Sequence, residues 1–175
     1  MTNRQDRLAL LAAGSTIAGA GCMVTQAILD RPALGIAFNG LLLVTAAWLW
    51  LRFRPGILIF AATIAGALSC LLWAAAFADA QWWLEPIYLA LSSAWWLGLS
   101  RALILAGRRR YGILTAALGV AALLDVAVSL TGITGPAYAL IGGWKLPLQL
   151  VWTVVTAYVA FRESRAPGQV ESHAR

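Results

Sequence analysis

Two ionisable residues, Asp125 and Lys145, lie inside apolar runs that are long enough to cross a lipid bilayer. Asp125 is in GILTAALGVAALLDVAVSLTGIT, which begins at Gly112, and Lys145 is in YALIGGWKLPLQLVWTVVTAYVAF, which ends at Phe161. An unpaired charge at the centre of a membrane helix costs about 2.5–3.5 kcal/mol on insertion scales. Each residue therefore requires a partner, a water-filled cavity or a function.

Both side chains are expected to point into a helical bundle. The neighbours of Asp125 on its helical face are small or weakly polar, and Lys145 shares its face with Gln149 and other polar residues, patterns typical of faces that pack against helices. At a rise of about 1.5 Å per residue, Asp125 lies roughly 14 Å and Lys145 roughly 10 Å from the outer end of adjacent, antiparallel spans. Three alternatives remain open: a buried ion pair, a cavity open to the outside, or a Lys145 side chain that extends outward to the interface.

The composition is that of an integral membrane protein. Of the 175 residues, 61% are hydrophobic and only 11% are charged, with a mean hydropathy of +0.78. Soluble domains carry about 25% charged residues. We expect residues 1–165 to form one transmembrane bundle and residues 166–175 to form a polar, disordered tail.

The apolar runs predict an all-α bundle of about six transmembrane helices, because a membrane-crossing helix needs about 20 apolar residues. Polar turns separate the runs, and Pro-Gly or Gly-Pro marks two of these turns. The predicted spans are Leu8–Leu29, Gly35–Leu51, Ile57–Ala78, Ile87–Gly107, 112–134 and 138–161.

The basic residues predict the orientation of the bundle. If the chain crosses the membrane six times, the turns on one side contain a single basic residue, Arg31. The turns and terminal flanks on the opposite side contain the other basic residues that lie outside the spans. Lys and Arg gather in cytoplasmic loops, so both termini are expected in the cytoplasm. The abundance of Ala, Leu, Arg and Trp indicates a GC-rich bacterial genome, and hence a bacterial cytoplasmic (cell) membrane. The cytoplasmic residues are Arg4, Arg7, Arg52, Arg54, Arg108–Arg110, Arg162 and Arg165.

The first span has an alternative interpretation as a lipoprotein signal. Arg4 and Arg7, the apolar core and Gly-Ala-Gly before Cys22 imitate such a signal. Gly19, three residues before the cysteine, departs from it, because a larger apolar residue is usual there. An ordinary first helix with a small-residue packing face is the favoured interpretation.

A short motif indicates an internal repeat. Thr-Ile-Ala-Gly-Ala at 16–20 recurs at 63–67, and a cysteine follows each copy. Three repeated helical hairpins would explain the match, and parallel repeats are common in transporters. Chance similarity in low-complexity apolar sequence is the alternative.

Polar and aromatic residues gather in the outer half of the predicted spans and outline a pocket. Trp95, Trp96 and Trp144 lie within this half rather than at a boundary, and Tyr88 and Gln149 lie at a similar level. Serine and amide side chains that merely join helices through hydrogen bonds are the alternative, at about 0.6 kcal/mol each. The predicted ligand-binding residues are Asp125, Lys145, Trp95, Trp96, Trp144, Tyr88 and Gln149, with Trp73, Gln26, Asn39, Ser92 and Ser93 nearby.

The last span is poorly suited to a continuous helix between Gly142 and Pro147. Broken helices beside an intramembrane charge are typical of substrate sites in transporters. A simple proline kink is the alternative.

Three function classes fit these observations. The first is a membrane protein that binds or transports a small molecule near Asp125 and Lys145. The second is an intramembrane enzyme acting on a lipid or isoprenoid, with Asp125 as its general acid. The third is a non-catalytic subunit of a larger membrane complex, whose small-residue faces dock onto a membrane protein partner.

Several site classes are absent from the sequence. The sole histidine, His173, is in the tail, and no Cys-x-x-Cys or phosphate-binding Gly-Lys-Ser/Thr motif occurs. We therefore expect no metal site and no cofactor. The formal charge of +6 reflects the cytoplasmic arginines, which are explained by topology and by contacts with anionic membrane lipids, so nucleic-acid binding is not expected.

Overall fold

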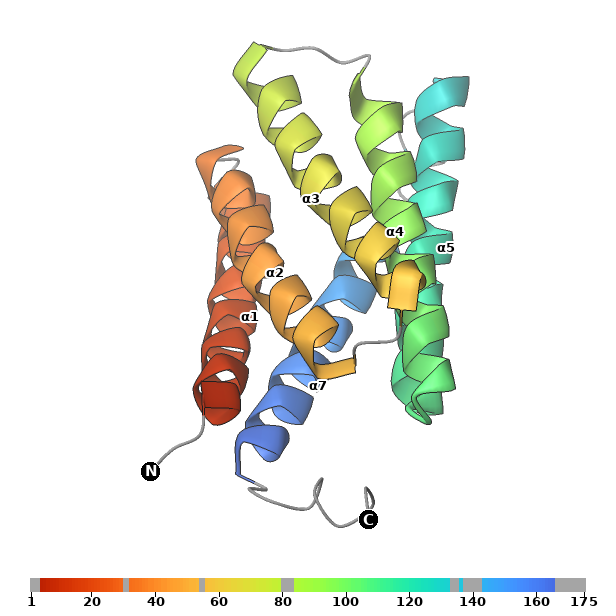
Figure 1. Ribbon diagram of the computed structural model, residues 1–175. Helices are drawn as coiled ribbons and strands as arrows, with labels where there is room; N and C mark the ends of the chain where they lie inside the picture. Colours follow the sequence, from red (N-terminus) through yellow and green to blue (C-terminus); the bar gives the residue numbers. More distant parts are fainter. Residues whose placement is uncertain are drawn as a thin grey trace.

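The structure is a computed structural model that describes residues 4–29, 32–53, 56–79, 84–132, 136 and 143–165. Within these ranges the chain forms helices and no strand, so the all-α prediction is confirmed. The tail 166–175 and the segment 137–142 lie outside the described residues. The helices are α1 (Arg4–Leu29), α2 (Pro32–Phe53), α3 (Gly56–Asp79), α4 (Glu85–Leu105), α5 (Arg109–Thr131) and α7 (Lys145–Ser164), as Figure 1 shows.

Four of these helices are long and apolar enough to cross a membrane. A shorter apolar stretch, Phe60–Trp73, lies within α3. Each described helix falls within or close to one of the six apolar runs of the sequence. The four candidate membrane-crossing segments are Arg7–Gln26, Ala33–Arg52, Glu85–Leu105 and Arg109–Thr131.

The six helices close into a ring. Each helix packs against the next along the chain, from α1 to α5 and on to α7, and α7 packs in turn against α1. Figure 1 shows the start of α1 and the end of α7 at the same end of the bundle, with the described part of α7 starting partway along it and running obliquely to that end. Because the ring is closed, all six helices can contribute side chains to one interior space.

Small residues allow the helices of the ring to approach closely. The Ser93 hydroxyl of α4 donates a hydrogen bond to the Gly119 carbonyl of α5 over 2.9 Å. A Cβ atom at Gly119 would lie 2.7 Å from the Leu97 side chain, and one at Gly66 would lie 2.8 Å from the Trp95 ring. Larger side chains at these two glycines would push α4 away from α5 and α3, as expected for helix contacts built on small residues.

The bundle carries polar groups inside and apolar side chains outside. Thr16 and Thr45 are buried and share a hydrogen bond of 2.7 Å between α1 and α2. Leu11, Ile28 and Ile57 are 61%, 73% and 79% exposed, and many other large apolar side chains are also exposed. So extensive an apolar exterior is typical of a surface that contacts lipid or another protein.

The described part of α7 begins at Lys145, and Pro147 is its third residue. The first turn of a helix has no intrahelical acceptors for its N–H groups, so the missing N–H of Pro147 costs no hydrogen bond there. The predicted break or proline kink between Gly142 and Pro147 stays a prediction, because the described helix begins within this segment. Gly142, at the other edge of the predicted break, lies outside the described residues.

Candidate functional site

Asp125 and Lys145 form an ion pair between α5 and α7. The Lys145 Nζ atom lies 2.9 Å from Asp125 Oδ2, and the Asp125 side chain is 8% exposed. This distance is short enough for a charge-assisted hydrogen bond. Of the three alternatives from the sequence, the ion pair is confirmed, and Lys145 does not extend away from Asp125 toward the interface.

The same ion pair lines a cavity of about 380 Å³, to which all six described helices contribute side chains. Tyr88, Trp95, Trp96 and Gln149 line this cavity with Asp125 and Lys145. Gln26, Asn39, Trp73 and Ser92 line it as well. The sequence presents the ion pair and the cavity as alternatives, but the structure contains both at the same place.

Trp144 is the predicted site residue that the structure does not place in the cavity lining. It precedes α7 at the N-cap position and is 66% exposed. The sequence gives its depth in the span but not the direction of its side chain, which depends on where α7 begins.

Sequence reasoning missed the apolar part of the cavity wall. Met23, Phe38 and Leu42, from α1 and α2, line the cavity on the side opposite α5. An apolar residue on a cavity wall and one in a packed core look alike in an apolar run, so no sequence signal separates them.

Aromatic packing fills the bundle directly below the cavity. Trp152, two turns along α7 from Lys145, is fully buried and contacts Trp96 edge-on, with ring centroids 4.7 Å apart. Its Nε1–H donates a hydrogen bond of 3.0 Å to the Thr115 hydroxyl, and Tyr111 packs beside it. Trp96, Tyr111 and Trp152, here called the aromatic layer, pack together on the side of the cavity toward the end of the bundle that carries Arg108 and Arg109.

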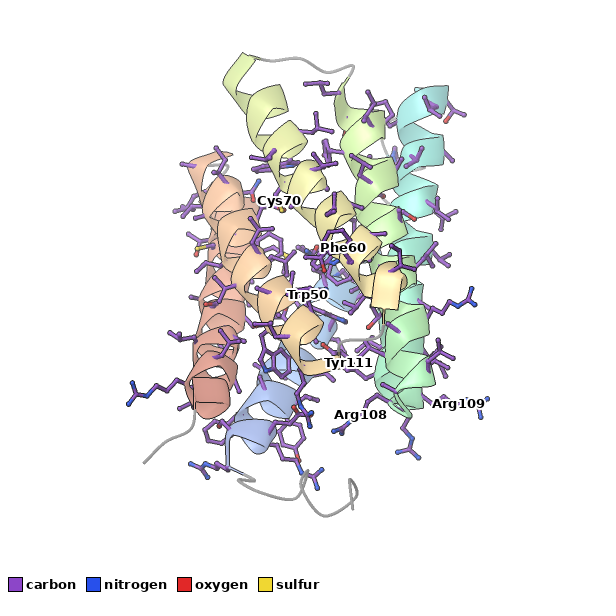
Figure 2. All side chains as sticks on the ribbon, viewed as in Figure 1. Trp50, Phe60, Cys70, Arg108, Arg109 and Tyr111 are labelled. Atoms are coloured by element: carbon purple, nitrogen blue, oxygen red, sulfur yellow. The ribbon has the colours of Figure 1, made fainter. Side chains whose placement is uncertain are left out.

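The cavity lies in the half of the bundle away from the arginines. In Figure 2, Cys70, which lines the cavity, is farther than Tyr111 from the end that carries Arg108 and Arg109. Its Sγ atom donates weakly to the Asn39 side-chain oxygen over 3.5 Å, which places both residues at the same level. A molecule in the cavity would therefore contact the half of the bundle opposite the termini.

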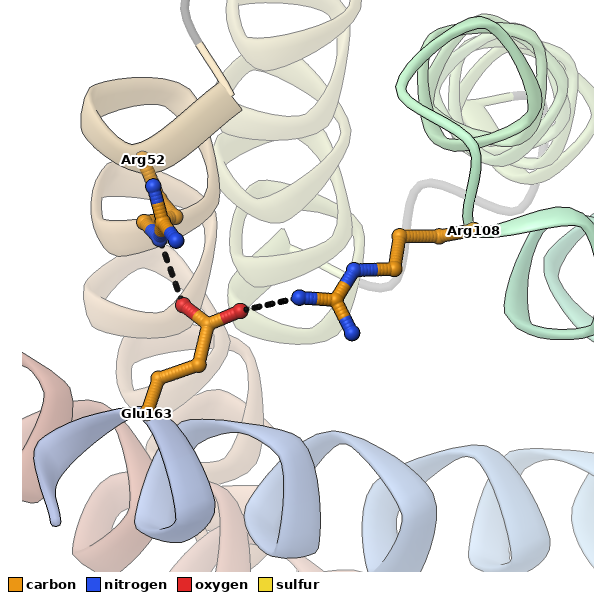
Figure 3. A network of polar contacts seen from close by, with 3 residues as sticks. All are labelled: Arg52, Arg108 and Glu163. Carbon is orange, nitrogen blue, oxygen red and sulfur yellow. Dashed lines mark hydrogen bonds and ion pairs between the residues drawn. The ribbon is translucent and has the colours of Figure 1, made fainter. Parts of the chain in front are cut away.

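A second ion-pair network joins three parts of the chain at the arginine-rich end (Figure 3). Glu163 of α7 contacts the Arg52 Nε atom over 2.6 Å and an Arg108 nitrogen over 3.0 Å. The Glu163 side chain is only 14% exposed, whereas Arg52 and Arg108 are 37% and 45% exposed. This Glu163 clamp ties α2 and the α4–α5 turn to the end of α7.

Replacing Glu163 with Gln should destabilise the folded bundle by about 0.4–2 kcal/mol, because exposed ion pairs contribute about 0.2–1 kcal/mol each. The loss should shrink as salt is raised, since salt screens partly exposed charges. Thermal unfolding in detergent at low and high salt measures both effects. Glu85→Gln, at the exposed start of α4, is the matched control. An equal, salt-independent loss in both variants would contradict a role for the clamp.

One oxygen of the central ion pair has no partner. Asp125 Oδ1 is buried and makes no hydrogen bond among the described residues. Leaving a buried acceptor unsatisfied costs about 1–3 kcal/mol, and more when the group is charged. Because Oδ1 is covered by protein atoms, a donor in the cavity would reach an unoccupied acceptor position of Asp125 only after the carboxylate rotates.

The part of the chain that the structure describes contains no cluster of three or more His, Cys, Asp or Glu residues suited to a metal ion. No family model, no curated protein and no solved structure matches this chain.

Proposed function

We propose that this protein is a multi-pass membrane protein that binds a small molecule, and transports it, through the cavity beside Asp125 and Lys145. The observation that carries the proposal is the cavity itself, in which six helices surround a buried ion pair and an unsatisfied carboxylate oxygen. Ionisable residues inside membrane spans are rare and typically mark ligand or ion pathways.

We propose that all six helices cross a bacterial cell membrane with both termini in the cytoplasm. The start of α1 and the end of α7 lie at one end of the bundle, where Arg52, Arg108 and Arg162 also lie. The positive-inside rule then places this end in the cytoplasm, in contact with anionic lipids. The cavity in this arrangement faces the outside of the cell.

The composition of the cavity wall supports ligand binding. The cavity volume of about 380 Å³ falls within the range of small-molecule sites, about 300–1,000 Å³. Such sites combine an apolar and aromatic wall with a few convergent polar groups. In this cavity Phe38, Trp95 and Trp96 form the aromatic part of the wall. The ion pair and the nearby amide side chains supply the polar groups.

Transport requires a second conformation, because the aromatic layer and the Glu163 clamp close the bundle on the cytoplasmic side of the cavity. Ligand release to the cytoplasm would require both to separate. We propose that this occurs by alternating access, in which one group of helices rocks against another.

The geometry favours binding over the enzyme alternative. A general acid must present a proton to its substrate. Asp125 instead accepts a contact of 2.9 Å from the Lys145 ammonium group, an arrangement of a carboxylate with a cation. A role in binding uses this arrangement directly, whereas acid catalysis would first have to disrupt it.

The proposal is tested by chemical modification of Cys70, which lines the cavity and is partly exposed. In a Cys22→Ser background, a membrane-impermeant methanethiosulfonate reagent should label Cys70 in intact cells. Soluble metabolites that enter the cavity should slow this labelling at saturating concentration. Labelling from the cytoplasmic side alone would contradict the proposed orientation.

A cavity-blocking variant makes the test specific. Ser92, half-buried on the cavity wall, can be replaced with Phe, and Ala94, exposed on the same helix, provides the matched control. Ser92→Phe should lower the Cys70 labelling rate by about tenfold or more by filling the cavity, whereas Ala94→Phe should leave it unchanged. Failure of every metabolite to slow labelling of the wild type would contradict a binding function.

A further inference from the structure

We infer that the ligand of the cavity is a small molecule of zero net charge that carries a hydrogen-bond donor and an acceptor on neighbouring atoms, as a primary carboxamide does. It would bind against the Asp125–Lys145 ion pair without separating the two residues. This inference rests on the proposed function and names the class of ligand for the same site.

The charge of the wall sets the charge of the ligand. Asp125 and Lys145 are the only charged residues that the described structure places in the cavity lining, and their charges cancel. A ligand with a net charge would meet no unpaired counter-charge on the wall of this cavity. Burying an unpaired charge is strongly unfavourable, so a neutral ligand is favoured over an anion or a cation of the same shape.

Asp125 requires a donor on the ligand. An ionised carboxylate offers about four acceptor positions, and Lys145 occupies one of them on Oδ2. The other oxygen, Oδ1, is covered and has no partner in the described ranges. The terminal torsion of an aspartate is soft, so a small rotation of the carboxylate presents an unoccupied acceptor position to the cavity.

Lys145 favours an acceptor on the ligand. An ammonium group carries three N–H donors, and within the described structure Lys145 makes one polar contact, to Asp125. Lys145, Leu146 and Gln149 all line the cavity, so the first turn of α7 borders it.

The rest of the cavity accommodates a flat apolar group. The buried Trp95 and Trp96 rings, whose centroids are 4.4 Å apart, form one part of the wall, and Phe38 lies on another. Aromatic rings favour stacked or edge-on contacts with other rings. An aromatic carboxamide therefore matches both the polar and the apolar part of the site.

Four probes of nearly identical shape separate the possibilities: benzamide, benzoate, benzamidinium and acetophenone. Benzamide is neutral with a donor and an acceptor, benzoate is an anion with acceptors alone, benzamidinium is a cation with donors alone, and acetophenone is neutral without a donor. Their dissociation constants are measured on the purified Cys22→Ser protein from the slowing of Cys70 modification. Benzamide should bind about tenfold or more tightly than each of the other three, as expected for hydrogen bonds to charged groups.

Variants of the ion pair should shift this preference in a defined direction. Asp125→Asn gives the wall a net charge of about +1 and should make benzoate the tightest probe. Lys145→Gln gives about −1 and should make benzamidinium the tightest. Ala94→Phe, outside the cavity, should retain the wild-type order. The wild-type comparison decides the inference even where an ion-pair variant fails to fold.

The outcomes separate this inference from the proposed function. Suppose that Cys70 is labelled from outside but benzoate, benzamidinium or acetophenone binds more tightly than benzamide, or benzamide gives no protection. Either result overturns the proposed ligand class and leaves the cavity as a binding site. Absence of Cys70 labelling from outside overturns the proposed function as well.

Discussion

Replacing Asp125 with Ala should destabilise the folded bundle by about 3–5 kcal/mol, the cost of breaking a buried ion pair from one side. Asp125 is 7% exposed, and its removal leaves the Lys145 ammonium without the one polar partner it has in the described structure. The Lys145 side chain is 25% exposed, which favours the lower part of this range because water can reach the stranded charge. Thermal or denaturant unfolding in detergent measures the loss.

A double variant separates the structural role of the pair from its role in the cavity. Asp125→Leu with Lys145→Leu should recover most of the stability, since apolar residues can replace a buried ion pair at little cost. The same variant should lose the preference for benzamide, because both polar groups are gone. Leu124→Ala, on the exposed side of α5, controls for shortening a side chain there. A double variant as unstable as Asp125→Ala would contradict the role of the stranded charge.

The ion pair could be predicted because its determinants are local. Two charges in neighbouring apolar runs, at similar distances from a shared turn, must lie at similar depth when the runs pair as antiparallel helices. Their cost in an apolar environment then requires a partner. The sequence presents the ion pair and the cavity as alternatives, whereas the ring of described helices leaves a cavity against the same pair. Whether a pair of charges borders a void depends on the packing of all the helices, which no single run encodes.

The Glu163 clamp could not be predicted for a related reason. Glu163, Arg52 and Arg108 are far apart in the sequence, and each occurs among other arginines in a polar turn or end. The orientation rule places all of them at the same side of the membrane but does not state which helices are neighbours there. The contact of α7 with the ends of α2 and α4 depends on its oblique course, shown in Figure 1.

The contacts of the aromatic layer could not be predicted from the sequence either. The sequence places Trp96 within a predicted span rather than at its boundary, and Trp152 lies within the predicted span 138–161. Amphipathic tryptophans usually anchor at the membrane interface, so an interior position requires a hydrogen-bond partner for the indole N–H. Thr115 provides this partner for Trp152, and both lie in apolar runs where neither residue alone predicts the contact.

Replacing Trp152 with Ala should destabilise the protein by about 3–5 kcal/mol, the range for removing a buried aromatic side chain. Trp152 is fully buried, contacts Trp96 and Tyr111, and satisfies the Thr115 hydroxyl. The vacated space would join the cavity to the arginine-rich half of the bundle, which the proposed orientation assigns to the cytoplasm, so a thiol reagent applied to inverted vesicles should label Cys70 faster. Unfolding in detergent and the labelling rate measure the two effects separately.

Two further variants identify which property of Trp152 matters. Trp152→Phe keeps the aromatic contact with Trp96 but removes the Nε1–H bond to Thr115, so it should cost about 1–3 kcal/mol and leave cytoplasmic labelling of Cys70 slow. Trp144→Ala, at a tryptophan that is 66% exposed and outside the cavity lining, should change stability by less than about 0.5 kcal/mol. Equal cytoplasmic labelling in Trp152→Ala and Trp144→Ala would contradict the aromatic layer as the barrier below the cavity.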